Sequence, residues 1–334
     1  MLIVAELSAN HNHNLQIARD SIRAIADTGA DAVKLQTYLP RSLTLDVRSD
    51  DFRLKGGLWD GRWLYDLYKE AYTPYEWHAE LFELARECGL ECFSTPFDLE
   101  AVDLLESLGN PIYKIASFEV MHLELIRYAA RLGRPMVIST GVASDREIRE
   151  AIDACREAGN DDVTLLKCTS AYPARIEDAH LSLIAEMRER YGVKVGLSDH
   201  SPGSLLPVMS VALGATMVEK HFILDRKIGG PDAAFSMDRD EFAAMVRDVR
   251  RAEAAMAPGD GIPADEYVTR AGRQWSRSLY VSAPIAAGEP FTRDNVACVR
   301  PGYSLHPRHL DALLGRLASR PYQPGDRIPA AELG

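Results

Sequence analysis

Residues 194–221, KVGLSDHSPGSLLPVMSVALGATMVEKH, decide the fold prediction, because they hold one complete unit of a pattern that the chain repeats. A short apolar run, Lys194–Ser198, is followed by a connecting stretch and then by a second run, Thr216–His221. Short runs rich in Val, Ile, Leu and Phe are typical of parallel strands that are buried on both faces. Both runs end in polar and charged residues, which indicates where functional groups gather.

The same pattern occurs eight times within about the first 260 residues. The other six runs are Leu2–Leu7, Ala32–Gln36, Glu91–Thr95, Ile112–Ala116, Met136–Thr140 and Val163–Cys168. Eight strand–helix units in roughly 250 residues are the number and size of a (β/α)8 TIM barrel, so we predict an α/β fold of this kind. An open doubly wound sheet is the alternative, but its first turn is usually rich in glycine. The first turn here, Ser8–Asn12, contains no glycine.

Capping signals predict where several helices of the barrel begin. Asn14 can cap a helix whose apolar residues recur on one face. Thr73–Glu76 reads as a capping box with proline at the first helical position, and Ser144–Glu147 reads as another. Asp238 and Glu241 are expected to open a helix that runs to about Met256.

The composition changes after about Ala257, which divides the chain into two predicted domains. We expect a catalytic barrel over residues 1–257, a linker rich in Pro and Gly over 258–277, and a small β-rich domain over 278–334. The core of so short a tail is marginal by itself, so the tail is expected to dock on a barrel, its own or a partner's.

The overall composition is that of an ordinary soluble globular protein. Of 334 residues, 46% are hydrophobic and 26% are charged. The net charge of -11 argues against a nucleic-acid or anionic membrane surface, so we expect neither partner. The sequence has five cysteines but no C-x-x-C pair, and neither a signal-like start nor a membrane-spanning run is found. We therefore predict a reducing, cytoplasmic setting.

Polar residues gather at the carboxyl ends of nearly all predicted strands, where a parallel barrel holds its active site. They are Glu6, Lys34, Gln36, Thr95, Lys114, Ser117, Glu119, Ser139, Lys167, Ser170, Tyr172, Ser198, His200, Glu219 and His221. One such residue often has only a structural role, but a buried charge costs several kcal/mol unless it is paired or bound. Their joint occurrence at one end therefore predicts an active site.

The residue types also indicate a ligand. Lys34 and Lys114, with hydroxyl groups around them, suit an anion that carries phosphate and carboxylate. His200 and His221 end adjacent strands, and two imidazoles with few protein partners suit a divalent ion that keeps water and substrate as other ligands. A histidine at a strand end is also often a simple hydrogen-bond donor, so both readings stay open for these two residues.

The motifs at the strand ends resemble the sialic acid synthase family. In the barrel, the resemblance rests on Glu6–His11, Val33–Thr37, Ser94–Phe97, Tyr113–Ser117, Ser139–Gly141, Gly196–His200 and Glu219–Phe222. In the tail, Ser278–Tyr280, Gly288–Glu289 and Val299–Gly302 are similar to the antifreeze-like (SAF, β-clip) domain that ends these synthases. The resemblance therefore covers both predicted domains.

The connection between the second and third strands resembles the pseudaminic acid synthase branch of that family. The matching segments are Lys55–Arg62, Leu64–Tyr68 and Thr73–His78. A connection of this length is usually functional, and over a barrel mouth it is placed to read the sugar. Ser170 stands where the neuraminic acid branch tends to have Asn, which argues against N-acetylmannosamine as the substrate.

The resemblance implies a transferase that condenses phosphoenolpyruvate (PEP) with an N-acetylated amino sugar. The implied reaction joins PEP, 2,4-diacetamido-2,4,6-trideoxy-L-altrose and water, and it gives pseudaminic acid and phosphate by C–O cleavage. The implied PEP ligands are Lys34, Thr95, Lys114, Ser117, Ser139, Ser170 and Ser198. A divalent metal, Mn²⁺ or Mg²⁺, on His200 and His221 would polarise the sugar aldehyde as a Lewis acid.

The resemblance also implies groups for proton transfer and for binding the sugar. Acid–base and sugar-contact carboxylates map to Glu6, Glu119 and Asp232, and which of them activates water stays open. Gln36 and Tyr172 are expected beside the sugar. In this family the tail of one subunit reaches over the partner's barrel, so Arg300 would contact the sugar in trans in a domain-swapped homodimer.

Three alternatives remain at this point. The enzyme could be an N-acetylneuraminate or legionaminate synthase of the same family. It could be a Schiff-base aldolase that uses Lys167, which requires a lysine of depressed pKa and no metal. A non-catalytic sugar-binding protein is the third alternative, since the tail resembles an antifreeze fold. Metal-dependent phosphate release would exclude the last two.

Overall fold

The computed structural model describes residues 1–257 and 272–334. The chain divides after Ala257 into two compact units, and each has its own hydrophobic core. Residues 258–271, which make up most of the predicted linker, lie outside the described residues. The linker over 258–277 therefore stays a prediction.

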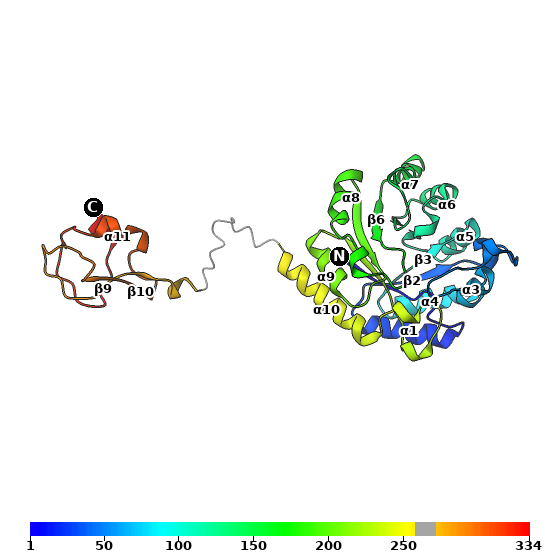
Figure 1. Cartoon of the computed structure of the whole chain (residues 1–334), viewed down its shortest axis with the longest axis horizontal. Coiled ribbons are helices and arrows are strands. Elements are labelled where there is room, and N and C mark those ends of the chain that lie inside the picture. Colours follow the sequence, from blue (N-terminus) through cyan, green and yellow to red (C-terminus); the bar gives the residue numbers. More distant parts are fainter. Residues whose placement is uncertain (258–271) are drawn as a thin grey trace. The chain divides into compact units, whose positions relative to one another are not determined.

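The first unit is a closed barrel of eight parallel strands in the order β1 to β8, which confirms the predicted TIM barrel. The strands are β1 (Leu2–Glu6), β2 (Ala32–Thr37), β3 (Glu91–Pro96), β4 (Tyr113–Ile115), β5 (Met136–Ser139), β6 (Val163–Cys168), β7 (Lys194–Asp199) and β8 (Met217–His221). Helices are arranged around the strands (Figure 1). The barrel closes where β1 pairs with β8, and this register aligns Glu6 with His221.

The helices of this unit follow the capping signals with one exception. They are α1 (Leu15–Asp27), α2 (Pro40–Leu43), α3 (Leu64–Ala71), α4 (Tyr75–Glu87), α5 (Leu99–Ser107), α6 (Leu123–Ala130), α7 (Asp145–Glu157), α8 (Leu183–Tyr191), α9 (Leu205–Ala212) and α10 (Arg239–Met256). Asn14 caps α1, and the boxes before α7 and α10 are present as predicted. The box at Thr73 was a wrong prediction: the N-cap is Pro74, and the Thr73 hydroxyl instead lies 3.0 Å from His11 Nε2.

The barrel interior has an apolar layer at its base, which we call the apolar floor. It consists of Val4, Ala32, Phe93, Ile112, Val137, Leu166 and Met217. Since side chains two positions apart on a strand share a face, the next inward residues are polar on nearly every strand. Gly196 completes the floor because β7 passes close to β8: a Cβ there would lie 2.5 Å from the Met217 carbonyl oxygen.

The second unit is built mostly from turns around a small core. β9 (Ser278–Val281) and β10 (Val296–Val299) form a two-stranded antiparallel sheet, and isolated bridges and the short helix α11 (Leu310–Leu313) complete it. Phe291 and Tyr322 are buried in its core. Across the parts of the chain that the structure describes, no helix is both long and apolar enough to cross a bilayer.

Candidate active site

Two buried lysines and two buried carboxylates meet at the barrel mouth, directly above the apolar floor. Lys34 pairs with Glu6, and Lys34 Nζ lies 3.7 Å from Glu219 Oε2. Lys114 Nζ lies 3.9 Å from Glu219 Oε1. Glu219 thus bridges both lysines, although the sequence analysis gave it no role. The available signal was its spacing of two residues from His221, which places both on the inward face of β8.

Burial and mutual attraction shift the pKa values of this cluster in opposite directions. Burial raises the pKa of Glu6 to about 7, against the opposing pull of Lys34. Burial also acts to raise the pKa of Glu219, but Lys114 and Lys34 outweigh it and lower that pKa below its ordinary value. Burial lowers the pKa of Lys114. Glu219 is therefore the fixed negative charge, and Glu6 can exchange a proton near neutral pH.

The predicted anion-binding hydroxyls surround these lysines. Lys34 Nζ donates to Thr95 Oγ1 at 3.2 Å, and Lys114 Nζ donates to Ser139 Oγ at 2.7 Å. Ser198 Oγ donates to Glu219 Oε1 at 3.1 Å. The structure therefore places three strand hydroxyls and both lysines in one cluster.

Two further hydroxyls converge on Gly141, at the end of β5. The Gly141 amide donates to Ser117 Oγ at 3.2 Å. A Cβ at Gly141 would lie 2.2 Å from Ser170 Oγ and 3.0 Å from Ser117 Oγ. Only glycine leaves room for this approach, so donors from three loops meet in a small polar cradle that suits a phosphate or carboxylate.

The two histidines stand side by side, with ring centroids 5.3 Å apart. His200 Nδ1 donates to the Thr169 carbonyl oxygen at 3.1 Å, which leaves Nε2 as the acceptor. His221 Nδ1 is buried without a hydrogen-bond partner and lies 3.9 Å from Asp232 Oδ2. Burial, reinforced by His200, lowers the pKa of His221 far below its ordinary value, so this imidazole is neutral.

This donor set fits a divalent metal. Two imidazole nitrogens, one of them without a partner, are available, and neutral imidazole is the form that ligates metals. Among residues 1–257 and 272–334, no group of three or more His, Cys, Asp or Glu side chains is arranged to hold a metal. Water and substrate would therefore complete the coordination, as in catalytic rather than structural sites.

A chain of hydrogen bonds connects Glu6 to the histidine side of the mouth. Gln36 Nε2 donates to Glu6 Oε1 at 3.1 Å and to Ser8 Oγ at 3.0 Å. Ser8 Oγ donates in turn to Asp232 Oδ2 at 2.5 Å. Ser8 has a φ of 47°, which is uncommon for a residue other than glycine and is often found at functional sites. The sequence analysis gave Ser8 no role of its own.

Glu119 has a buried carboxylate oxygen without a hydrogen-bond donor. This residue ends the 3₁₀ turn Ser117–Glu119, and the oxygen is Oε2. Burial raises its pKa to about 7, although Lys114 acts in the opposite direction. A perturbed, unpaired carboxyl group beside a cluster of this kind is a candidate for proton transfer.

Two predicted residues lie elsewhere. Lys167, the candidate for a Schiff base, alternates with the inward-facing Leu166 and Cys168, and its Nζ donates to Thr169 Oγ1 at 2.8 Å. It therefore faces away from the barrel interior, which removes the geometric basis of the aldolase alternative. Arg300 belongs to the second unit, where it is exposed just after β10.

A buried ion pair braces the strands that carry the histidines. Lys220 Nζ donates to Asp199 Oδ2 at 2.6 Å and also to the Ser201 carbonyl oxygen. Asp199 precedes His200 and Lys220 precedes His221, so the pair connects β7 to β8 on the outer wall of the barrel. We therefore expect this pair to hold together the ends of the two strands that carry the histidines.

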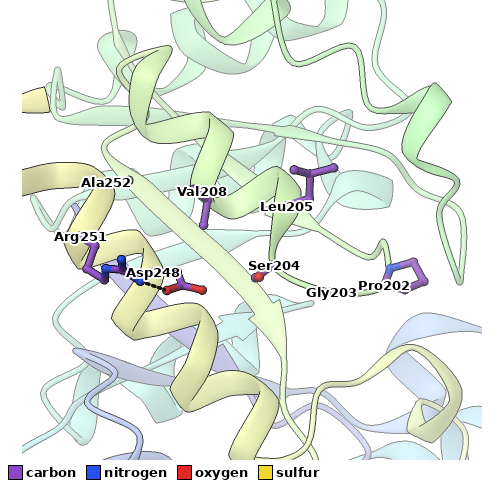
Figure 2. Close-up of a pocket in the computed structure, with 8 residues that line it drawn as sticks. All are labelled: Pro202, Gly203, Ser204, Leu205, Val208, Asp248, Arg251 and Ala252. Atoms are coloured by element: carbon purple, nitrogen blue, oxygen red, sulfur yellow. Dashed lines mark hydrogen bonds and ion pairs between the residues drawn. The ribbon is translucent and has the colours of Figure 1, made fainter. Parts of the chain in front are cut away.

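A groove on the outer wall has fewer side chains that could bind or react with a ligand than the mouth has. It lies between the turn before α9 and helix α10 and has a volume of about 730 Å³ (Figure 2). Its two charged lining residues, Asp248 and Arg251, pair with each other at 3.2 Å. The mouth of the barrel therefore remains the candidate active site.

Comparison with known proteins agrees with this arrangement. Residues 21–261 match the NeuB family, and residues 276–334 match the SAF domain. The chain is 49% identical to the pseudaminic acid synthase of Helicobacter pylori over 95% of this chain and 93% of that protein. It is also 49% identical to the pseudaminic acid synthase of Campylobacter jejuni, over 98% of this chain and 95% of that protein.

A solved structure shows the same barrel. The N-acetylneuraminic acid synthetase of Leptospira borgpetersenii has a TM-score of 0.71 and 31% identity, over 79% of this chain and 88% of that one. The resemblance read from the sequence motifs is therefore confirmed. The chain belongs to the NeuB family and carries a SAF domain that follows the barrel in the sequence.

Proposed function

We propose that this protein is a pseudaminic acid synthase. It condenses PEP with 2,4-diacetamido-2,4,6-trideoxy-L-altrose and consumes one water, and the products are pseudaminic acid and phosphate. C3 of PEP forms the new C–C bond with the sugar aldehyde, water adds to C2, and the C2–O bond to phosphate breaks. The observation that carries the proposal is the polar cluster of two lysines and five hydroxyls beside two adjacent histidines. The names of the relatives that are 49% identical support the choice of sugar.

The lysine cluster binds and orients PEP. Lys34 and Lys114 neutralise its charges, while Thr95, Ser139 and Ser198 and the cradle at Gly141 donate or accept hydrogen bonds. When Glu6 is protonated, Lys34 loses the charge of its nearest carboxylate and can turn to the incoming anion. Holding both reactants in one geometry supplies a large part of the acceleration in such condensations.

The carboxylates handle the protons. Water that adds to C2 must lose a proton, and the aldehyde oxygen must gain one as the C–C bond forms. Glu119 Oε2 has no hydrogen-bond donor, and burial raises the pKa of this carboxyl group to about 7, so we assign it the proton from water. Glu6, Gln36 and Asp232 form the polar wall on the sugar side.

His200 and His221 would hold a divalent metal, Mn²⁺ or Mg²⁺. When bound, the metal supplies Lewis-acid polarisation of the sugar carbonyl. Asp232 Oδ2 lies 3.9 Å from His221 Nδ1, and no hydrogen bond occupies that nitrogen.

The proposal includes a cytoplasmic homodimer. Five free thiols suit a reducing compartment. Arg300, exposed on the SAF unit, is the residue that we expect to reach a partner's sugar site in a domain-swapped dimer.

Phosphate release from PEP tests the function. The assay compares the diacetamido sugar with N-acetylmannosamine, each with Mn²⁺ and with EDTA. We expect release with the diacetamido sugar, and loss of release in EDTA. Release only with N-acetylmannosamine would keep the chemistry and overturn the substrate. No release with either sugar would overturn the reaction.

A further inference from the structure

The long connection between β2 and α4 contains a built hairpin. Arg53 and Trp63 form an antiparallel bridge, and the Leu54 amide donates to the Arg62 carbonyl oxygen at 2.9 Å. At its tip, the Gly56 amide donates to Asp60 Oδ1 at 2.6 Å. The tip requires glycine because residues 56, 57 and 61 have φ values of 79°, 74° and 79°. We call residues 53–63 the tip hairpin.

Trp59, close to the turn of the tip hairpin, contacts other segments of the barrel unit at two points. Its Nε1 donates to the Pro231 carbonyl oxygen at 3.0 Å, immediately before Asp232. Its ring contacts that of Tyr172 at an interplanar angle of 47°, with centroids 5.7 Å apart. Tyr172 in turn packs on His200, with centroids 4.5 Å apart, and on Phe235, with centroids 5.2 Å apart.

These contacts form an aromatic wall of Trp59, Tyr172 and Phe235 beside the two histidines. Phe235 is buried, and its ring centroid lies 4.9 Å from that of His221. Because the Trp59 N–H is already donated to Pro231, the indole offers a neighbouring ligand only carbon atoms. The mouth therefore has a charged side, around Lys34 and Lys114, and an aromatic side.

We propose that Trp59 is a specificity-determining residue, which favours an amino sugar with a deoxygenated, apolar edge over one that carries a hydroxyl there. The inference rests on the proposed function, because it concerns the sugar of that same reaction. A methyl group buries apolar surface against the indole, whereas a hydroxyl at the same place finds no hydrogen-bond partner on the ring. Discrimination of this kind against an added hydroxyl reaches about 10²-fold.

The test uses Trp59→Ala, Trp59→Phe and, as the matched control, Leu58→Ala in the same hairpin, where the leucine side chain is exposed. kcat/KM is measured by phosphate release for the 6-deoxy sugar, 2,4-diacetamido-2,4,6-trideoxy-L-altrose, and for its analogue that differs only by a hydroxyl at C6. The KM for PEP is measured alongside and reports whether the lysine cluster is intact.

For Trp59→Ala we expect the preference for the 6-deoxy sugar to fall about 10- to 100-fold, with the KM for PEP within about twofold. Trp59→Phe keeps an aromatic ring and should retain most of the preference, and Leu58→Ala should retain all of it. If the wild type prefers this sugar and Trp59→Ala keeps that preference, or only raises the KM for PEP, the inference is overturned by itself. If the wild type does not accept the sugar, the proposed function is overturned and the inference with it.

Discussion

At the scale of single residues, Glu119 differs from the other carboxyl groups of the mouth. Glu6 and Glu219 pair with lysines, and Asp232 accepts from Ser8. Glu119 Oε2 is buried without a donor. A buried carboxylate without a partner is costly to the fold, which indicates that it is kept for the reaction.

Glu119→Gln should therefore lower kcat by about 10²- to 10⁴-fold, the usual contribution of a general acid or base. The KM for PEP should stay within about threefold, because the lysines and hydroxyls are unchanged. Steady-state phosphate release measures both constants, and Glu124→Gln, at an exposed position of α6, is the control. A raised KM for PEP with normal kcat would contradict proton transfer and point to a binding role.

The same substitution should stabilise the fold at neutral and higher pH. The pKa of Glu119 is raised from 4.5 to about 7 in the folded protein, so the folded state binds the proton more tightly than the unfolded chain. The wild type therefore loses stability as pH rises from about 4.5 to about 7, by up to about 3 kcal/mol. Glu119→Gln lacks this loss, so its advantage in urea unfolding should be small near pH 4.5 and largest above pH 7. A constant difference across this range would contradict the shifted pKa.

At the scale of elements, the Asp199–Lys220 pair decides how β7 meets β8. Lys220→Met leaves Asp199 buried without its cation, which should lower the free energy of unfolding by about 3–5 kcal/mol. Removing both charges with Asp199→Asn should recover a large part of that loss. Urea unfolding of the single and double variants measures the coupling.

A matched control lies on β7, the strand that carries Asp199. Lys194 of β7 pairs with Asp162 at 3.0 Å, but both side chains are exposed. Lys194→Met should cost less than about 1 kcal/mol. Equal effects at the two lysines would show that the buried pair does not brace the strands.

The strands could be predicted from sequence almost to the residue, because each is a short apolar run between polar turns. Most of the predicted site followed from them, since strand ends in a closed barrel must converge. Glu219 was given no role because its bridge to Lys34 and Lys114 joins strands that are far apart in the sequence. Trp59 was missed as an individual because its contacts with Tyr172 and Pro231 join segments more than 100 residues apart. Thr73 was predicted to cap α4, but its hydroxyl group contacts His11 instead. His11 is distant in the sequence, so no local capping rule predicts this contact.

At the scale of the whole molecule, the homodimer proposal makes a quantitative prediction. Glu119→Gln inactivates the barrel of its own chain, and Arg300→Ala inactivates only the SAF unit of its own chain. If Arg300 acts in trans, mixing the two variants under subunit exchange restores about a quarter of the wild-type activity, since half of the dimers then hold one intact site. If Arg300 acts within its own chain, mixing restores none, and the domain-swapped dimer is wrong.

The apolar floor has a consequence for the history of such enzymes. Nearly every barrel strand has an apolar residue at one inward position and a polar residue of the site at the next, so the two layers share no side chains. Substitutions in the upper layer can therefore change which molecule reacts, while the layer below stays packed and the strands keep their register. In a barrel of this kind, single substitutions at the mouth can change substrate specificity without destabilising the core.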